Sequence, residues 1–219
     1  MNSLFPIFLK LAGRRCLVVG AGKVAEQKTA GLLEAGALVR VVAVRASEPV
    51  RAWAIEKKIE LEVRAYAPSD LAGNFLVVVA AGSPLLNEFI YREAQRQGIL
   101  CNVVDVPELC DFYYPAVVQR GDLQIAISTN GQSPSLAQKL RQQLEGQFGP
   151  GYARWVEELG ETRRLVLASD LDPATKSDLL HSLASAEAFE AAIEKQAKIA
   201  QARHKASDKE FENEGKVTV

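Results

Sequence analysis

The residues whose types and spacing could do chemistry stand at the ends of short apolar runs. Gly20, Gly22 and Ala25 follow the run CLVV at 16–19 with the spacing G-x-G-x-x-A. After a strand and before a helix, this spacing is typical of dinucleotide binding. The first glycine permits a tight turn, the second lets the backbone approach a pyrophosphate, and the small third residue lets helix and strand pack closely. The phosphates would lie on amide groups at the helix N-terminus, where the helix dipole favours anions.

A carboxylate, Asp105, follows a second strand-like run. It is the one carboxylate placed directly at the end of a central run (CNVV, 101–104), and Pro107 closes that run. Ligands of open parallel sheets bind at the carboxyl ends of the strands. Asp105 could therefore act as a base or orient a substrate nitrogen. It could equally cap a turn before Pro107, which Asp often does, and its position leaves both interpretations open.

The end of the second run carries Val44 and Arg45. Sites that prefer NAD usually place Asp or Glu there, to bind the ribose hydroxyls. Arg45 could accept the 2′-phosphate of NADP, stack on adenine or point into solvent. The sequence leaves the choice between NAD and NADP open.

A polar loop, TNGQS at 129–133, stands before a predicted helix in which Ser133 is the N-cap and Pro134 the first residue. Such a loop is a second potential anion site, with Arg141 nearby in sequence. The alternative is an ordinary capped helix with a solvated face, and we favour this alternative for Lys139.

Five β-rich runs alternate with helical patterns and would position these residues. The runs are Arg15–Val19, Leu38–Val44, Ile59–Ala65, Phe75–Ala80 and Leu100–Val104. Helical spacing after the glycine turn and over 48–57 and 84–97 supplies the crossovers. The fourth run is apolar throughout, as expected of a central parallel strand covered on both faces. The alternation predicts an α/β fold, a Rossmann-type doubly wound parallel sheet.

The pattern changes after Pro107. Phe112–Gln119 and Leu123–Ser128 are predicted strands of a hairpin, and a helix runs from Pro134 to about Phe148. Further helices are expected near 152–168, 173–184 and 187–205. The predicted divisions are an NAD-binding Rossmann domain (1–113), a β-hairpin/helix dimerisation segment (114–149), a small helical C-terminal domain (150–204) and a disordered tail (205–219). The middle segment is too small to fold alone, so a second copy of the chain is its simplest partner.

Composition excludes several classes of function. The net charge of −1 over 219 residues gives no reason to expect nucleic acid or an anionic membrane as a partner. The longest apolar run, Phe75–Ala81, is too short to span a bilayer. The N-terminus has no signal-peptide layout, and the odd number of cysteines, 3, suits reduced thiols, so we expect a cytoplasmic protein. Without C-x-x-C spacing and with only 2 histidines, both expected on the surface, a Cys/His metal site is not expected.

Seven motifs in order identify a resemblance that extends from Leu4 to about Leu144. They are LFPIFL (4–9), VVGAGKVA (18–25), LLEAGA (32–37), CNVVDVP (101–107), FYYPA (112–116), AISTNGQSP (126–134) and LAQKLR (136–141). The chain resembles the precorrin-2 dehydrogenase / sirohydrochlorin ferrochelatase family of sirohaem biosynthesis. The match is to the stand-alone form, which is similar to the N-terminal module of sirohaem synthase.

This resemblance implies oxidation of precorrin-2 to sirohydrochlorin with NAD⁺, an interlocked homodimer, and Asp105 as the key catalytic residue. With the strand-end rule, it assigns cofactor contacts to Gly20, Gly22, Lys23, Val24, Val44, Arg45 and Ala81. The tetrapyrrole is expected to contact Asn102, Ser128, Thr129, Gly131, Ser133 and Arg141. Thr129 aligns with the position that is phosphorylated in some fused synthases. No residue is assigned to a resident metal.

Two alternatives remain. Some family members also insert Fe²⁺ into sirohydrochlorin with the same aspartate, so the chain could be bifunctional, with Co²⁺ as another possible metal. It could instead be a non-catalytic, nucleotide-binding regulatory protein. The motifs at 102–107 and 128–134 argue against that second alternative, because a sensor of nucleotides needs no tetrapyrrole cleft.

Overall fold

The chain divides between Tyr114 and Pro115 into two units in the computed structural model, which describes residues 4–194 and 198. The first unit contains the predicted nucleotide fingerprint and Asp105. The second contains the predicted hairpin and the helices that follow it. The boundary lies one residue from the predicted end of the nucleotide domain at 113.

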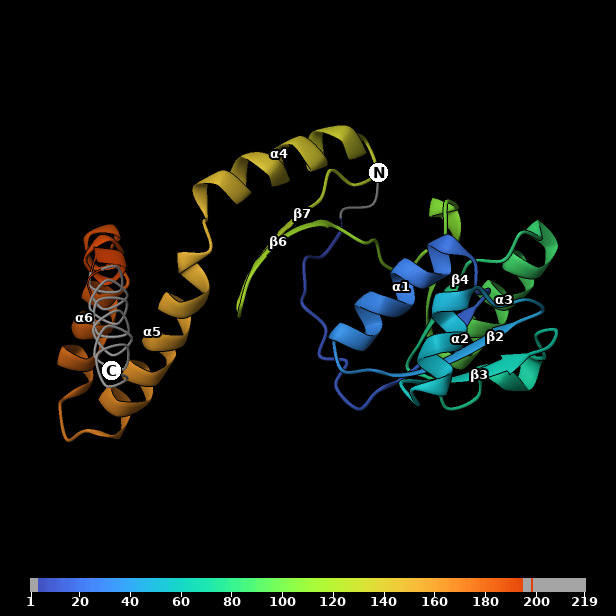
Figure 1. The fold of residues 1–219 in the computed structure, drawn as a ribbon, viewed down its shortest axis with the longest axis horizontal. Helices are drawn as coiled ribbons and strands as arrows, with labels where there is room; N and C mark the ends of the chain where they lie inside the picture. Colours follow the sequence, from blue (N-terminus) through green and yellow to red (C-terminus); the bar gives the residue numbers. More distant parts are fainter. Residues whose placement is uncertain (1–3, 195–197, 199–219) are drawn as a thin grey trace, which may run out of the picture. The chain divides into compact units, whose positions relative to one another are not determined.

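A five-stranded parallel sheet forms the first unit (Figure 1). Its strands are β1 (Arg15–Val19), β2 (Leu38–Ala43), β3 (Ile59–Val63), β4 (Leu76–Val79) and β5 (Leu100–Val103). The order β3-β2-β1-β4-β5 reverses direction between β1 and β4, which is the topological switch point of a doubly wound sheet. The predicted fold class is therefore confirmed.

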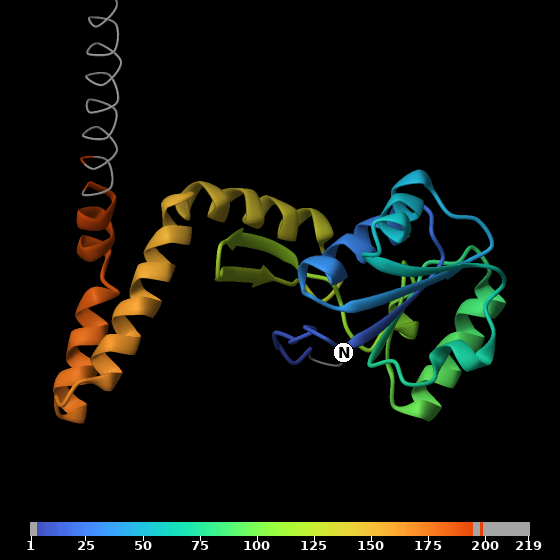
Figure 2. The ribbon, with the colours of Figure 1, turned by 60° about the horizontal axis from the view of Figure 1, so that its bottom comes forward.

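Helices cover both faces of this sheet (Figures 1 and 2). They are α1 (Lys23–Glu34), α2 (Glu48–Ile55) and α3 (Pro84–Gln97), with 3₁₀ turns η1 (Pro68–Leu71) and η2 (Pro107–Leu109). Successive strand residues point to opposite faces, so Cys16 and Val18 pack with α1 and α2 while Leu17 packs with α3. Burial on both faces explains why the central strand β4 (LVVV) is a continuous apolar run, whereas the edge strand β3 (IELEV) alternates apolar and charged residues.

Four of the five strands end before their predicted limits. Val44, Ala65, Ala80 and Val104 lie past the last residue of their strands. These residues lie at the carboxyl edge, where the loops begin, although the amides of Ala80 and Val104 still donate to Val19 and Val79. At its other end, β4 begins at Leu76 instead of Phe75. Apolarity alone does not distinguish a strand residue from a loop residue that packs beside it.

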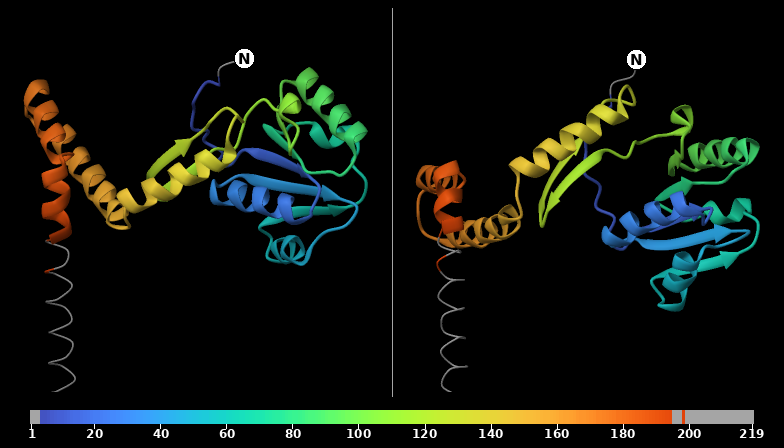
Figure 3. Two further views of the ribbon diagram at one scale, coloured as in Figure 1. Left: turned by 90° about the horizontal axis from the view of Figure 1, so that it is seen from above. Right: turned by 45° about the horizontal axis from the view of Figure 1, so that its top comes forward.

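The second unit contains an antiparallel hairpin and helices (Figure 3). The elements are β6 (Ala116–Arg120), β7 (Leu123–Ile127), α4 (Pro134–Gln147), α5 (Gly151–Ala168) and α6 (Pro173–Leu183), and residues 186–194 are also helical. The hairpin and its helix are confirmed, and α4 packs against both strands. The prediction of a strand over residues 112–115 is wrong, because the strand begins at Ala116. Pro115 has no amide proton to donate to a neighbouring strand.

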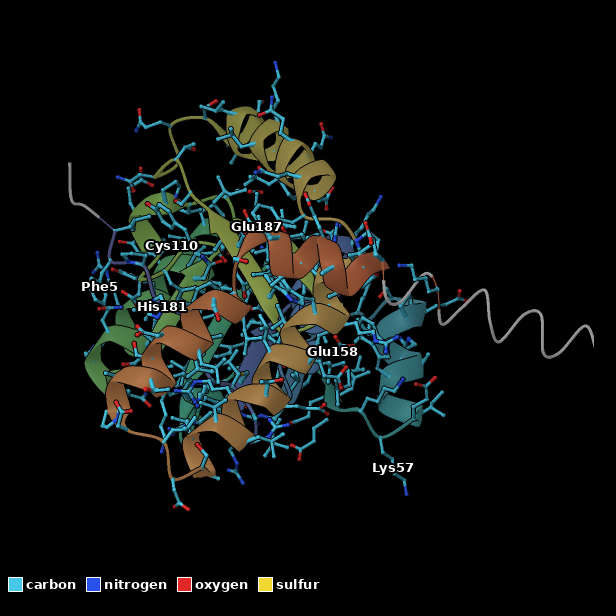
Figure 4. The ribbon with its side chains drawn as sticks, turned by 90° about the vertical axis from the view of Figure 1, so that its left-hand side faces the viewer. Phe5, Lys57, Cys110, Glu158, His181 and Glu187 are labelled. Carbon is cyan, nitrogen blue, oxygen red and sulfur yellow. The ribbon has the colours of Figure 1, made fainter. Side chains whose placement is uncertain are left out.

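Aromatic side chains hold the last helices together. The ring of Phe189 lies 4.2 Å from that of Tyr152 and 5.0 Å from that of Trp155, between ring centroids. Trp155 is therefore a packing residue. His181 is exposed on α6 (Figure 4). The predicted helix over 187–205 extends beyond the described residues, and the predicted tail 205–219 lies outside them, as does His204. No helix in the described part of the chain has the length and apolarity needed to cross a membrane.

Candidate functional site

The glycine turn after β1 joins three strands. Gly20 has φ +111°, and its amide donates to the Val42 carbonyl at 2.9 Å. A Cβ at Gly20 would lie 2.4 Å from the carbonyl oxygen of Ala80, which is backbone. Only glycine fits this position, both because of its φ and because of the approach of β4. The turn predicted from the sequence is therefore present.

Gly22 serves a different purpose from Gly20. It is the N-cap of α1, it brings no side-chain hydrogen bond to the first turn, and a Cβ there would meet no atom within 4 Å. The first amides of a helix have no partner within the helix. Lys23 and Val24 begin the helix and are exposed. The turn thus leaves both space and amide donors for an anion such as pyrophosphate.

A cavity of about 360 Å³ lies at the switch point. Four of the predicted cofactor residues line it: Gly20, Val44, Arg45 and Ala81. Gly22, Lys23 and Val24 do not line it and form the adjacent start of α1. The cavity is of the size that small ligands occupy in proteins.

Arg64 lines this cavity and was not predicted. Its guanidinium donates to both carboxylate oxygens of Asp70, at 2.7 and 2.8 Å, and to Glu62 at 2.8 Å. Asp70 is buried, and the hydrogen bonds from Arg64 lower the pKa of its carboxyl group. These contacts fix the Arg64 side chain. Arg64 comes directly after β3, and the rule that ligands bind at the carboxyl ends of strands could have predicted it as a cavity residue.

Tyr66 also lines the cavity and was not predicted. Its hydroxyl oxygen is buried and has no hydrogen-bond partner among the described residues. Burial raises the pKa of Tyr66 to about 12, so the hydroxyl carries its proton at neutral pH. A buried hydroxyl without a partner is costly, and a polar ligand in the cavity would supply one. The open glycine, the helix amides and this hydroxyl together fit a dinucleotide.

Asp105 is exposed in a turn that follows β5, and its φ is +60°. This left-handed conformation is uncommon for residues other than glycine, and Asp and Asn tolerate it best. The turn before Pro107, which the sequence analysis gave as the alternative interpretation of Asp105, is therefore present. It places the carboxylate at the carboxyl edge of the sheet.

The Cys110 thiol supports this turn (Figure 4 labels Cys110). Its Sγ lies 3.1 Å from the Val103 carbonyl oxygen and 3.2 Å from that of Val106, on either side of Asp105. Burial raises the pKa of Cys110, so the thiol keeps the proton that it donates. The buried Asn102 amide donates to the Phe112 carbonyl at 2.8 Å and to Cys110 Sγ at 3.4 Å. In the structure, Asn102 thus secures the segment beyond Asp105.

A smaller cavity, of about 200 Å³, lies against Asp105. We call it the Asp105 pocket. Its other lining residues are Lys28, Tyr113, Tyr114, Cys110, Asn102 and the backbone neighbours of Asp105 up to Pro107. Lys28 comes from α1 and was not predicted, since helical spacing shows which face is buried but not what lies opposite it. Among the described residues, no group of three or more His, Cys, Asp and Glu side chains is placed to hold a metal ion.

The predicted tetrapyrrole loop belongs to the second unit. The Ser133 hydroxyl caps α4 by accepting from the Leu136 amide at 3.2 Å, as expected, and Thr129 Oγ1 accepts from the Ser133 amide at 3.1 Å. Ser128 accepts from the Asn130 amide at 3.1 Å, and Gly131 has φ +77°. Arg141, by contrast, is paired with Glu145 on the next turn of α4.

Comparison with known families matches most of the chain in two consecutive parts. Residues 7–116 match the family described as "Putative NAD(P)-binding". Residues 120–147 match the family described as "Sirohaem biosynthesis protein central". The first match spans the sheet and both cavities, and the second covers the end of the hairpin and α4.

Individual proteins give the same picture. The chain is 41% identical over 149 residues to siroheme synthase of Nitrosococcus oceani, covering 68% of this chain and 32% of that protein. It is 38% identical over 162 residues to siroheme synthase 2 of Yersinia enterocolitica, covering 74% and 34%. The chain thus spans about a third of the length of these relatives. Among solved structures it is similar to "SirC, precorrin-2 dehydrogenase", with a TM-score of 0.76, 26% identity, and coverage of 90% of this chain and 98% of that one.

Proposed function

Because this chain belongs to the NAD(P)-binding family matched at residues 7–116, we propose that it oxidises precorrin-2 to sirohydrochlorin with NAD⁺ in sirohaem biosynthesis. One observation carries the proposal furthest. The carboxyl edge of a single sheet bears both the dinucleotide cavity and the exposed carboxylate of Asp105. The proposed cofactor site and the proposed base therefore lie on the same rigid sheet. A dehydrogenase requires such fixed positions for the two groups.

The oxidation removes two hydrogens from the reduced macrocycle, one as hydride and one as a proton. When bound, the nicotinamide ring accepts the hydride. Asp105 takes the proton, because its exposed side chain can reach a substrate at the edge of the sheet. The amides at the start of α1 bind the pyrophosphate, and the Tyr66 hydroxyl donates to a polar group of the dinucleotide.

We propose that the tetrapyrrole contacts Ser128, Thr129, Gly131, Ser133 and Arg141, and contact with Asn102 is also proposed. We also propose that two copies of the chain form a homodimer in the cytoplasm. Exposed apolar side chains support an association, since Phe5 is 84% exposed and Phe8 66% exposed. The free thiols of the three cysteines suit a reducing compartment.

Anaerobic incubation of the purified protein with precorrin-2 and either NAD⁺ or NADP⁺ tests the proposed activity. The visible spectrum of sirohydrochlorin should appear with NAD⁺. If the protein binds NAD⁺ but neither oxidises nor binds a tetrapyrrole, the dehydrogenase proposal fails and the regulatory alternative replaces it. Sedimentation equilibrium tests the dimer separately.

Charge reversal at Arg45 should change the choice of cofactor. Arg45 lines the dinucleotide cavity and is exposed, so it can meet a 2′-phosphate. We expect Arg45→Asp to lower kcat/KM for NADP⁺ about tenfold relative to that for NAD⁺, because a phosphate contact is replaced by repulsion. Arg96→Asp on α3 is the control, since Arg96 does not line the cavity. An unchanged ratio of the two cofactors would show that Arg45 does not face the ribose.

Removal of the Cys110 thiol should loosen the Asp105 turn. Cys110→Val fills a similar volume but donates no proton to the Val103 and Val106 carbonyls. We expect kcat for precorrin-2 to fall about tenfold with the Kd for NAD⁺ unchanged, because small displacements of a catalytic group are costly. Cys110→Ser keeps a donor and should retain more activity than Cys110→Val. Equal activity of the two variants would contradict a supporting role for the thiol.

A further inference from the structure

Lys28 stands apart from the other lysine of α1. Lys23 is exposed at the start of the helix, whereas Lys28 is partly buried between Ala25 and Leu32, which belong to the buried face. Its side chain lines the Asp105 pocket. A lysine placed at the border of a core and inside a pocket loses hydration that an exposed lysine keeps.

The Lys28 ammonium is supported by a ring and not by a paired carboxylate. Its Nζ lies 3.4 Å from the centroid of the Tyr114 ring. None of the ion pairs within 4.0 Å among the described residues involves Lys28, whereas Arg40 and Arg64, also partly buried, both pair with Asp70. Burial lowers the pKa of Lys28, and the negative charge of Asp105 opposes that shift. The ammonium therefore has donors available for an anion in the pocket.

The Asp105 pocket creates an electrostatic problem for an acidic ligand. A carboxylate side chain of a tetrapyrrole that entered beside Asp105 would meet a like charge. Lys28 is the one cationic side chain among the described residues that line this pocket. With about 200 Å³, the pocket is smaller than the ~300–1,000 Å³ of typical small-ligand sites, so it suits one edge of a macrocycle.

We infer that Lys28 binds a peripheral carboxylate of the tetrapyrrole and so fixes which edge of the macrocycle lies against Asp105. The inference rests on the proposed function and adds a substrate-binding residue to it. Tyr114 holds the ammonium in place by a cation–π contact. The charge of Lys28 also offsets repulsion between Asp105 and the bound carboxylate.

Steady-state kinetics of Lys28→Met separates this role from others. We expect KM for precorrin-2 to rise about tenfold, with KM for NAD⁺ and Tm within error of the wild type. The Kd for sirohydrochlorin, measured by anaerobic absorbance titration without cofactor, should rise by a similar factor. Lys28→Arg keeps the charge and should recover most of the affinity. Lys58→Met removes the same charge from an exposed lysine outside the pocket and should change neither constant.

Two results would overturn the inference while leaving the enzyme intact. One is an active Lys28→Met variant with unchanged KM for precorrin-2 and unchanged Kd for sirohydrochlorin. The other is an equal loss of NAD⁺ binding or a large fall in Tm, which would make Lys28 a structural residue. Failure of the wild type to oxidise precorrin-2 contradicts the proposed function instead, so the two failures are distinguishable.

Discussion

Replacement of Asp105 by asparagine is expected to lower kcat for precorrin-2 oxidation by about a thousandfold, with the fold and NAD⁺ binding preserved. The loss reflects removal of a general base, which is worth ~10²–10⁴ in rate. Asparagine suits the left-handed turn as well as aspartate does, and the side chain is exposed, so folding should not suffer. Anaerobic single-turnover kinetics gives the rate, and titration with NAD⁺ gives the cofactor affinity.

Glu108 supplies a control for the Asp105 experiment. It is an exposed carboxylate three residues further along, on η2, and does not line the Asp105 pocket. Glu108→Gln removes the same charge from the same segment and should keep nearly full activity. Turnover of Asp105→Asn close to that of the wild type would remove Asp105 from the mechanism.

Substitution of Gly20 by alanine is expected to cost about 3 kcal/mol of stability or more. The added Cβ would lie 2.4 Å from the Ala80 carbonyl oxygen, and the residue would be held at φ +111°. The backbone of Ala80 is fixed by its own amide, which donates to Val19 at 2.8 Å. For a chain of this size such a loss lowers Tm by about 10 °C, which differential scanning calorimetry measures.

Gly22→Ala is the matched comparison for Gly20→Ala. No atom lies within 4 Å of a Cβ at Gly22, so the free energy of unfolding should change little. The methyl group would instead occupy space that the pyrophosphate needs, so the Kd for NAD⁺ should rise at least tenfold. Equal effects of the two substitutions on Tm would contradict the proposal that Gly20 is needed for the fold and Gly22 for ligand binding.

The sequence predicts the sheet well because parallel strands buried on both faces leave a strong local pattern. β4 is apolar throughout and β1 is apolar after Arg15, and the fingerprint fixes which loop follows β1. Strand ends are predicted less well, because Val44 and Val104 are apolar but lie past the last residues of β2 and β5. Residues 112–115 were wrongly assigned to a strand because aromatic residues favour strands. Pro115 has no amide proton with which to pair in a sheet.

The candidate site is predictable where one segment determines it. Gly20, Arg45 and Asp105 follow strands, so the topology rule locates them. Lys28 lies within α1, and Tyr66 lies in the loop after β3, past Arg64. The roles of both depend on what lies opposite them in space. Asn102 was predicted to contact substrate, and its buried amide is instead bonded to Phe112 and Cys110 in the structure. Contact with the substrate stays a prediction for Asn102.

The contacts of Gly20 have a consequence for the order of events during synthesis. The turn is bordered by Val42 and Ala80, which are separated from it by 22 and 60 positions in the numbering. A nascent chain that has emerged only as far as the fingerprint therefore contains the glycines but lacks Val42 and Ala80, which contact Gly20. Such non-local contacts form late. The dinucleotide cavity therefore forms only after β4 and the loop that follows it have been synthesised. A nucleotide that binds there stabilises the folded domain and not the shorter chain.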